Sequence, residues 1–335
     1  MAKVNPETLA GRTLRTSGNL ILDGNGDRVR LVGVNCAGLE WDATGERITE
    51  RVAMAFDEWK ANIVRLPLSQ DRWYGFAHDQ KKDPDGSGYR GLVDGVIDMA
   101  AERGKYIWFD LHWSNKGRWG RYIRQHCMPD LNSVTFWDNA ARRYANHPLV
   151  LFGLYNEPYP ETWEEWRSGG YNREEKFEMV GMQTLIDTVR NTGAKNLVIV
   201  GGIDWAYDMR GCEGHPLSDG EGNGIVYDCH VYPWKPAPYD DYIPPSLAAK
   251  HPIIIGECGH YGDVTDNPEG PQRSPYAEWV PELLDYIRER DFSVTAWDLH
   301  PEAGPSLIGD FRGTPTEFWG VFYREFCVRA NSAST

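Results

Sequence analysis

The sequence lacks any hydrophobic run that approaches the roughly 18 residues of a membrane-spanning helix. It also lacks a run of basic residues, and 35 Lys and Arg against 49 Asp and Glu give a formal net charge of −14. Binding to nucleic acid needs a basic face that neutralises phosphates. We therefore expect neither a membrane nor a nucleic-acid partner.

Closely spaced cysteines are absent as well. The six cysteines, at 36, 127, 212, 229, 258 and 327, show no spacing typical of a metal site, so no metal is expected. Cys36, Cys229 and Cys258 lie in or beside expected strands and are interpreted as buried free thiols. Cys127 and Cys212 fall in expected loops, where a bridge is an alternative. The amino terminus lacks a secretory signal, so the protein is either intracellular or secreted with its leader removed.

What is present is a series of eight short apolar segments, each typical of a buried strand. They end near Asn35, Arg65, Asp110, Tyr155, Val200, His230, Glu257 and Trp297. Successive ends are roughly 27 to 45 residues apart, which leaves room for one helix and two loops each time. Apolar residues at three- and four-residue steps predict helices at 48–59, 134–144 and 279–287.

Strand followed by helix, repeated eight times, predicts an α/β fold, a single closed (β/α)8 TIM barrel over residues 1–335. Turn signals Asp-Gly and Asn-Gly between two apolar runs predict an N-terminal β-hairpin at about 18–32. We expect Asn132 or Ser133 to cap the helix near 134, and residues 73–91 to form a surface loop. An open doubly wound sheet is the alternative, because periodicity does not report closure.

Two glutamates stand out because each directly follows an apolar segment. Glu157 lies in Leu-Tyr-Asn-Glu-Pro, and Glu257 ends Ile-Ile-Ile-Gly-Glu. Burying a carboxylate at a strand end is costly, so two of them placed alike indicate a site. The loops after the strands of a barrel share one face, where side chains from the fourth and seventh strands can meet. The pair predicts a two-carboxylate hydrolase, in which the separation of the carboxyl groups decides between retention and inversion.

Polar or aromatic residues end most of the other strands too. They are Arg65 in Val-Arg-Leu-Pro, His112 in Asp-Leu-His-Trp, Asn156 in Asn-Glu-Pro, His230 and Tyr232 in His-Val-Tyr-Pro, and Trp297 in Thr-Ala-Trp-Asp. With the two glutamates, these segments resemble, in the same order, glycoside hydrolase family 5, the cellulase family of clan A. The resemblance runs from about residue 20 to 325.

The resemblance implies a retaining mechanism, with Glu257 as the nucleophile and Glu157 as the general acid and then base. Asn156 would bind the 2-hydroxyl of the sugar. Arg65 and Tyr232 would keep Glu257 ionised, because a neighbouring cation and a donor favour a charged carboxylate. His112 and His230 would line the same subsite, and Trp297 would form its floor.

Tryptophans point to a sugar ligand as well. Eight of the 14 lie at or shortly after an expected strand end, at 41, 73, 113, 119, 163, 205, 234 and 297. Flat aromatic rings match the apolar faces of sugars. We expect an open cleft for a β-linked polysaccharide or oligosaccharide, with Trp41, Trp113, Trp205 and Trp234 as binding candidates beside Trp297.

The resemblance therefore implies a secreted, monomeric endo-β-1,4-glucanase that needs no cofactor. A β-mannanase and an exo-acting β-glucosidase or β-mannosidase are alternatives, and exo action is favoured if the polar segment 298–306 walls off one end of the cleft. Cys258 departs from the aromatic or other apolar residue that many relatives carry after the nucleophile. A non-catalytic polysaccharide-binding barrel and a metal-dependent hydrolase are the remaining alternatives.

Overall fold

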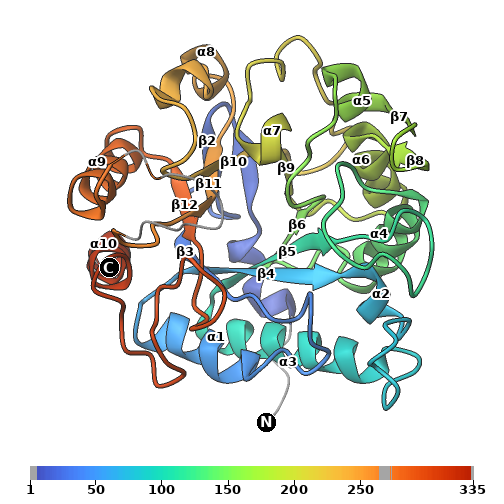
Figure 1. Cartoon of the computed structure of the whole chain (residues 1–335), viewed down its shortest axis with the longest axis horizontal. Helices are drawn as coiled ribbons and strands as arrows, with labels where there is room; N and C mark the ends of the chain where they lie inside the picture. The colour runs from blue at the N-terminus through green and yellow to red at the C-terminus, as the bar shows by residue number, and fades with distance from the viewer. Residues whose placement is uncertain (1–5, 264–271, 273, 333–335) are drawn as a thin grey trace.

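The computed structural model describes residues 6–263, 272 and 274–332, and its centre is a closed barrel of parallel strands (Figure 1). In chain order the barrel strands are β3 (Val32–Asn35), β4 (Ile63–Ser69), β5 (Tyr106–Trp113), β6 (Val150–Gly153), β9 (Val198–Gly201), β10 (Ile225–Val231), β11 (Ile253–Cys258) and β12 (Ser293–Ala296). Each pairs with the next in this order, and β12 closes the ring by pairing with β3. The predicted eight-stranded barrel is confirmed, and the open sheet is excluded.

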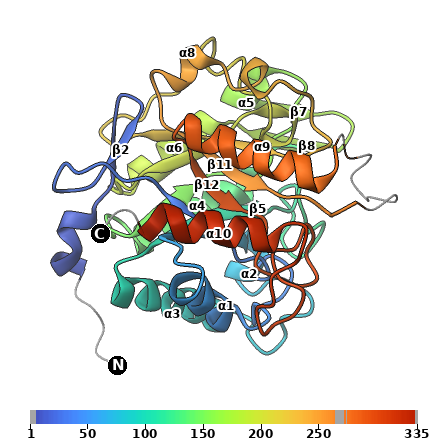
Figure 2. The same ribbon diagram turned by 90° about the vertical axis from the view of Figure 1, so that its left-hand side faces the viewer.

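Helices alternate with these strands and surround the barrel. They are α1 (Ile48–Asp57), α2 (Gln70–Trp73), α3 (Ser87–Arg103), α4 (Leu131–Arg143), α5 (Trp163–Ser168), α6 (Met182–Asn191), α7 (Ile203–Ala206), α8 (Pro245–Ala248), α9 (Tyr276–Glu289) and α10 (Gly320–Ser332). Two short 3-10 helices, η1 (Pro6–Arg12) and η2 (Tyr239–Asp241), complete the helical elements described. Figure 2 shows α9 and α10 side by side over β11 and β12. The helices predicted at 48–59, 134–144 and 279–287 correspond to α1, α4 and α9.

Two local predictions are wrong. The cap of α4 is Asp130, whose carboxylate accepts the backbone N–H groups of Asn132 and Ser133. Ser133 instead completes a capping box by accepting the N–H of Asp130, so the helix begins earlier than expected. The stretch 73–91 is a loop only in its middle, because Trp73 ends α2 and α3 begins at Ser87.

The predicted N-terminal hairpin is present and lies slightly earlier than expected. Strand β1 (Arg15–Ser17) pairs antiparallel with β2 (Leu20–Leu22) through a turn at Gly18, which has a positive φ of 58°. Leu14, directly before β1, and Ile21 in β2 are buried against a cluster of barrel residues that includes Ile63, Trp108 and Leu151. The hairpin thus covers the end of the barrel at which the strands begin.

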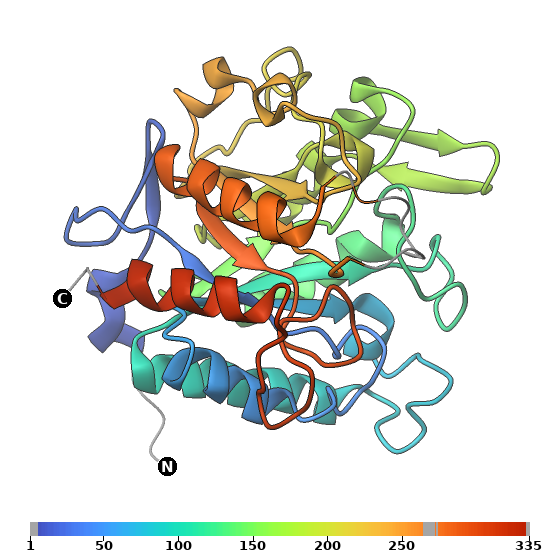
Figure 3. The same cartoon turned by 60° about the vertical axis from the view of Figure 1, so that its left-hand side comes forward.

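A second hairpin, β7 (Gly169–Asn172) and β8 (Phe177–Val180), lies between α5 and α6 and projects from the body of the molecule (yellow-green in Figure 3). At its base, Met179 forms a β-bridge with Asp130, and the N–H of Val180 donates to the backbone of Pro129. These contacts tie the hairpin to the segment that leads into α4.

All six cysteines are buried and free. The bridge considered for Cys127 and Cys212 is therefore wrong, and the thiol of Cys127 instead contacts the sulfur of Met179 at 3.8 Å. In the described part of the chain, no helix has the length and apolar character required to cross a bilayer.

Candidate active site

The carboxyl ends of the barrel strands open into a cavity of about 560 Å³. Eight of the predicted site residues line it, namely His112, Asn156, Glu157, Trp205, Tyr232, Trp234, Glu257 and Trp297. They come from β5 and β11, from α7 after β9, and from the segments after β6, β10 and β12, so residues far apart in the sequence meet at one mouth. This is the face of a barrel where functional side chains gather.

Glu257 lies at the end of β11 and is held by two donors. Arg65 Nη1 donates to its Oε1 at 2.6 Å, and the hydroxyl of Tyr232 donates to its Oε2 at 2.8 Å. Glu257 is only 5% exposed, so water contributes little to its solvation. A cation and a hydroxyl donor replace that solvation and stabilise the ionised carboxylate.

Arg65 is the centre of a buried polar network. From the middle of β4 its guanidinium also donates to the side-chain oxygens of Asn35 and Asn156, at 2.8 and 2.5 Å, and pairs with Asp110 at 3.0 Å. Burial alone would lower the pKa of Arg65, but Asp110 and Glu257 outweigh it and raise the pKa above its ordinary value. The guanidinium therefore remains charged and fixes the side chains around it.

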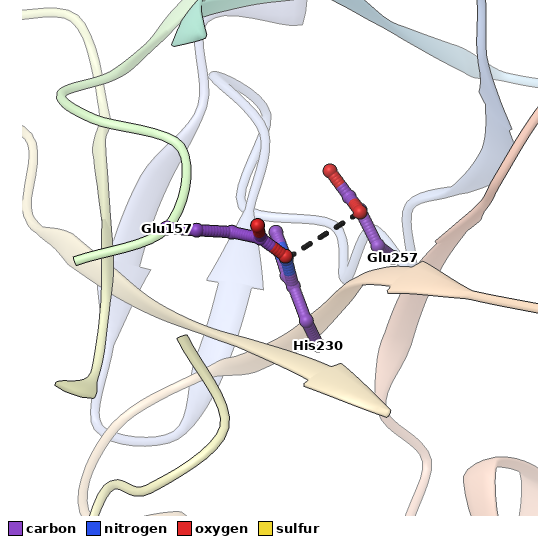
Figure 4. Close-up of side chains that lie close together, drawn as sticks. All are labelled: Glu157, His230 and Glu257. Carbon is purple, nitrogen blue, oxygen red and sulfur yellow. Dashed lines mark hydrogen bonds and ion pairs between the residues drawn. The ribbon is translucent and has the colours of Figure 1, made fainter. Parts of the chain in front are cut away.

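Glu157, in the segment after β6, faces Glu257, and the ring of His230 lies between the two carboxylates (Figure 4). His230 Nδ1 lies 2.8 Å from Oε1 of Glu157 and 3.6 Å from Oε2 of Glu257. One oxygen of each carboxylate and a ring nitrogen of His230 all lie within 4.8 Å of one another. The side chain of Glu157 is 20% exposed, and it is the more open of the two carboxylates.

The neighbours of His230 favour its protonated form. Burial lowers its pKa, but Glu257 and Asp228 raise it further, to about 10. Asp228 lies 3.2 Å from Nε2 and also accepts the N–H of Gly256, which orients the ring. Glu157, His230 and Glu257 are spaced like metal ligands, and a metal would have to displace the proton that the neighbouring carboxylates favour on His230. The hydrogen bonds of His230 describe a carboxylate joined to an oriented imidazole.

His112 repeats this arrangement on β5. Its Nδ1 lies 2.6 Å from Asp110, and its Nε2 lies 3.4 Å from the amide nitrogen of Asn156. Burial lowers the pKa of His112, but Asp110 raises it above its usual value. The ring stacks on Trp297 with centroids 5.5 Å apart and an angle of 18°. Trp297 is thus held by stacking in the lining of the cavity.

The tryptophan prediction is correct only in part. Trp205 and Trp234 line the cavity together with Trp297. Trp41 packs beside the cluster of Tyr232 and Trp297 and donates to Glu46 at 2.9 Å. Trp113 is half-buried and is not among the residues lining the cavity. The remaining candidates pack elsewhere: Trp73 is fully buried between helices and barrel, Trp119 contacts Tyr74 and Phe76, and Trp163 contacts Trp166.

Several residues of the site were not predicted. Asp204 in α7 and Lys235 and Tyr261 in loops line the cavity without a strand pattern to predict them. Gly304 and Pro305 line it too, and they belong to the segment 298–306 that was considered only as a wall of the cleft. Asp110 and Asp228 hold the two histidines, and here the sequence carries a signal, because each aspartate stands two residues before its histidine on one strand. Alternate residues of a strand share a face, so an Asp-X-His repeat indicates an oriented imidazole.

The comparisons with known proteins agree with this geometry. An endoglucanase from Paenibacillus polymyxa is 25% identical, and the match covers 86% of this chain and 80% of the relative. Endoglucanase A from Butyrivibrio fibrisolvens is 23% identical over 88% of this chain, and endoglucanase E-5 from Thermobifida fusca is 24% identical over 85%. The chain spans 62% and 55% of the length of these two relatives.

Solved structures share the fold. A β-glucanase from Saccharophagus degradans, crystallised in complex with cellotetraose, superposes with a TM-score of 0.75 and 22% identity over 99% of this chain and 97% of that one. A hyperthermophilic endocellulase from Pyrococcus horikoshii gives a TM-score of 0.71 with 16% identity over 95% of this chain and 99% of that one. The family model "Cellulase (glycosyl hydrolase family 5)" matches residues 22–303. The chain therefore belongs to glycosyl hydrolase family 5 and is a glycoside hydrolase.

Proposed function

We propose that the protein is a retaining endo-β-1,4-glucanase that cleaves a β-linked glucan by double displacement. The observation that carries the mechanism is the short separation of its two carboxylates, whose oxygens approach within 4.8 Å. Retaining glycosidases have carboxyl groups about 5 to 5.5 Å apart, whereas inverting enzymes need about 6.5 to 9.5 Å to admit a water. The spacing leaves no room for that water between Glu157 and Glu257.

In the first step Glu257 attacks the anomeric carbon, and the bond from that carbon to the leaving oxygen breaks. Glu157 gives its proton to the leaving oxygen. Glu257 suits the role of nucleophile because Arg65 and Tyr232 bind both of its oxygens in the ionised form. In the second step Glu157 takes a proton from water, which attacks the same carbon and releases Glu257 with net retention.

The supporting residues position the sugar around this reaction. Asn156 accepts from Arg65 and its amide lies near His112, so it is fixed to bind the 2-hydroxyl of the sugar. Trp297 offers a flat surface below the ring, and Trp205 and Trp234 extend the lining of the cleft. Trp41 would act through its packing beside Trp297. We assign no contact with the sugar to Trp113.

The choice of a glucan rests on the relatives, several of which are named endoglucanases. A second candidate is exo action, because Gly304 and Pro305 of the segment 298–306 line the cavity and Gly304 accepts a hydrogen bond from Tyr261. A β-mannanase remains the alternative for the backbone sugar. Because such polysaccharides lie outside cells, we propose secretion, and we propose that residues 1–335 form one catalytic domain and act as a monomer.

A digestion panel tests the proposal. Cello-, manno- and mixed-linkage oligosaccharides are incubated with the protein, and the products are sized over time. We expect internal cleavage of cello-oligosaccharides, and chelator in the reaction should not change the rate. Release of one product size from the chain end would establish exo action instead. Hydrolysis of manno-oligosaccharides alone would replace the glucan, and no hydrolysis of any β-linked substrate would refute the proposal.

A further inference from the structure

The loop after β5 lies against the segment that carries Glu157. Two backbone hydrogen bonds between Ser114 and Arg124, of 3.0 and 3.1 Å, close this loop at its base. The next residue, Gln125, is not among the residues that line the cavity, and the chemistry above gives it no role. Its side-chain amide nevertheless contacts two residues of the site, Asn156 and Glu157.

The contacts of Gln125 determine which way its amide points. Nε2 donates to the carbonyl oxygen of Glu157 at 2.7 Å and to that of His126 at 2.8 Å. A primary amide has two N–H donors, so this nitrogen is fully used. On the other side, Oε1 accepts from Nδ2 of Asn156 at 3.2 Å. The reverse orientation would set Oε1 against two carbonyl oxygens, so the surrounding hydrogen bonds allow only this one.

Backbone contacts on either side of Glu157 hold Gln125 in this place. The hydroxyl of Tyr155 donates to the carbonyl of His126 at 2.9 Å and accepts the N–H of the same residue at 3.1 Å. The N–H of Tyr159 donates to the carbonyl of Cys127 at 2.8 Å. Together with the amide of Gln125, these bonds join the segments 125–127 and 155–159. The position of Gln125 relative to the site is therefore fixed.

Asn156 is held at both ends of its amide. Its Oδ1 accepts from Arg65 at 2.5 Å, and one N–H of Nδ2 is directed to Gln125. Because an amide is planar, these two contacts also set the direction of the second N–H. That N–H lies on the side of His112, whose Nε2 is 3.4 Å from Nδ2, longer than the usual range for a hydrogen bond. Asn156 and His112 both line the cavity, so the second N–H is available to a hydroxyl there.

We propose that Gln125 is a positioning residue, which holds the amide of Asn156 so that its second N–H meets the 2-hydroxyl of the sugar. The inference rests on the proposed function, in which Asn156 binds that hydroxyl. Arg65 alone would fix only the oxygen of Asn156, and Gln125 supplies the second point that fixes the plane of the amide. A contact with the 2-hydroxyl strengthens at the transition state, so a loosely held amide would lower kcat more than it would raise KM.

Two substrates isolate the contact with the 2-hydroxyl. They are 4-nitrophenyl β-cellobioside and its analogue without the 2-hydroxyl on the sugar that carries the nitrophenyl group. The kcat/KM of each is measured from the release of nitrophenol, and the ratio of the first to the second is compared between the full-length protein and its variants. For Gln125→Met, which keeps the length of the side chain, and for the smaller Gln125→Ala, we expect this ratio to fall about tenfold. On the substrate with the 2-hydroxyl, the loss should lie in kcat more than in KM.

Gln183 in α6 provides the matched control. Its amide donates to the carbonyl of Ser218 at 2.9 Å and accepts the N–H of the same residue at 2.8 Å, and it does not line the cavity. Gln183→Met should therefore leave the ratio unchanged, even if it lowers the free energy of unfolding as much as Gln125→Met does.

A double substitution tests whether Gln125 acts through Asn156. Asn156→Ala should itself lower the ratio, and in this background Gln125→Met should lower it no further, because the group that Gln125 holds is gone. The inference would be overturned by an unchanged ratio in both Gln125 variants, by a further fall of equal size in the Asn156→Ala background, or by an unchanged ratio in Asn156→Ala. If the unaltered protein cleaves neither 4-nitrophenyl β-cellobioside nor cello-oligosaccharides, the proposed function itself fails, and the inference fails with it.

Discussion

Arg65 Nη1 and Glu257 Oε1 lie 2.6 Å apart although 192 residues separate them in the chain. Both side chains are buried, so the pair exists only because β4 and β11 enter the same barrel. A buried carboxylate is costly unless a partner offsets its lost solvation, and a hydrogen-bonded cation does so. The fold thus supplies the partner that holds Glu257 in place for the proposed reaction.

Replacing Glu257 by Gln should abolish turnover. The amide is nearly isosteric and can still accept from Arg65 or Tyr232, but it cannot form the glycosyl ester. We expect kcat on a cello-oligosaccharide to fall by about 10⁴-fold or more, measured by initial rates. An unchanged unfolding midpoint would show that the variant is folded. Retention of a tenth of the activity would remove Glu257 from the nucleophile role.

Replacing Glu157 by Ala should give a loss that depends on the leaving group. Without its general acid the enzyme should cleave cello-oligosaccharides about 10²- to 10⁴-fold more slowly. The 2,4-dinitrophenolate of a 2,4-dinitrophenyl cellobioside leaves without protonation, so the first step on this substrate should survive, and added azide should accelerate turnover. The product should be the β-configured azide. Glu161→Ala, exposed and four residues away, is the control, and an equal loss on both substrates would contradict the role of Glu157.

Glu40 should make stability depend on pH. It is buried, and burial raises its pKa from 4.5 to about 7. The folded protein therefore keeps a proton that the unfolded chain releases between these values. The free energy of unfolding should decrease as pH rises through this window, by about 3 kcal/mol from this group.

Glu40→Gln abolishes this contribution to the pH dependence of stability, because an amide does not titrate. Urea unfolding at pH 4.5 and pH 8 should show a smaller decrease for the variant than for the unaltered protein. The exposed Glu58→Gln is the matched control and should leave the decrease unchanged. Equal decreases in all three proteins would show that Glu40 does not titrate in this range.

Substitution by alanine should lower the free energy of unfolding at Gly256 and raise it at Gly95. A Cβ on Gly256 would overlap the carboxylate of Asp228, which orients His230. We expect Gly256→Ala to lose about 1–3 kcal/mol of unfolding free energy and most of its activity. Gly95 is exposed in α3, and a Cβ there meets nothing within 4 Å. Gly95→Ala should gain about 0.5–1 kcal/mol, and denaturant unfolding measures both changes.

Most of the barrel could be predicted from the sequence, because buried parallel strands are short apolar runs and the turns between them leave room for helices. Glu157 and Glu257 were identified because each ends an apolar run, where a carboxylate loses solvation and is typical of a functional site. Element ends were less predictable. The cap at Asp130 depends on a carboxylate that also accepts from Gln70, a contact between residues far apart in sequence.

The other parts of the site could not be predicted because tertiary contacts determine them. Nothing in the local sequence favours a left-handed turn at Asp204, Trp205 and Ala206, since none of these residues prefers positive φ values as glycine does. Trp73 and Trp205 both follow barrel strands, but one is fully buried under helices and the other is exposed in the cleft. Their positions depend on the packing of loops, which periodicity does not describe.

The burial of all six thiols has a practical consequence for handling the enzyme. No covalent crosslink has to form during folding, so production does not depend on an oxidising compartment, and reducing agents should leave the native state intact. Each cysteine also becomes a reporter, because a thiol-reactive dye can reach it only after the surrounding structure opens. Mass spectrometry of the labelled peptides would then map where the barrel opens first on heating, with no engineered probe.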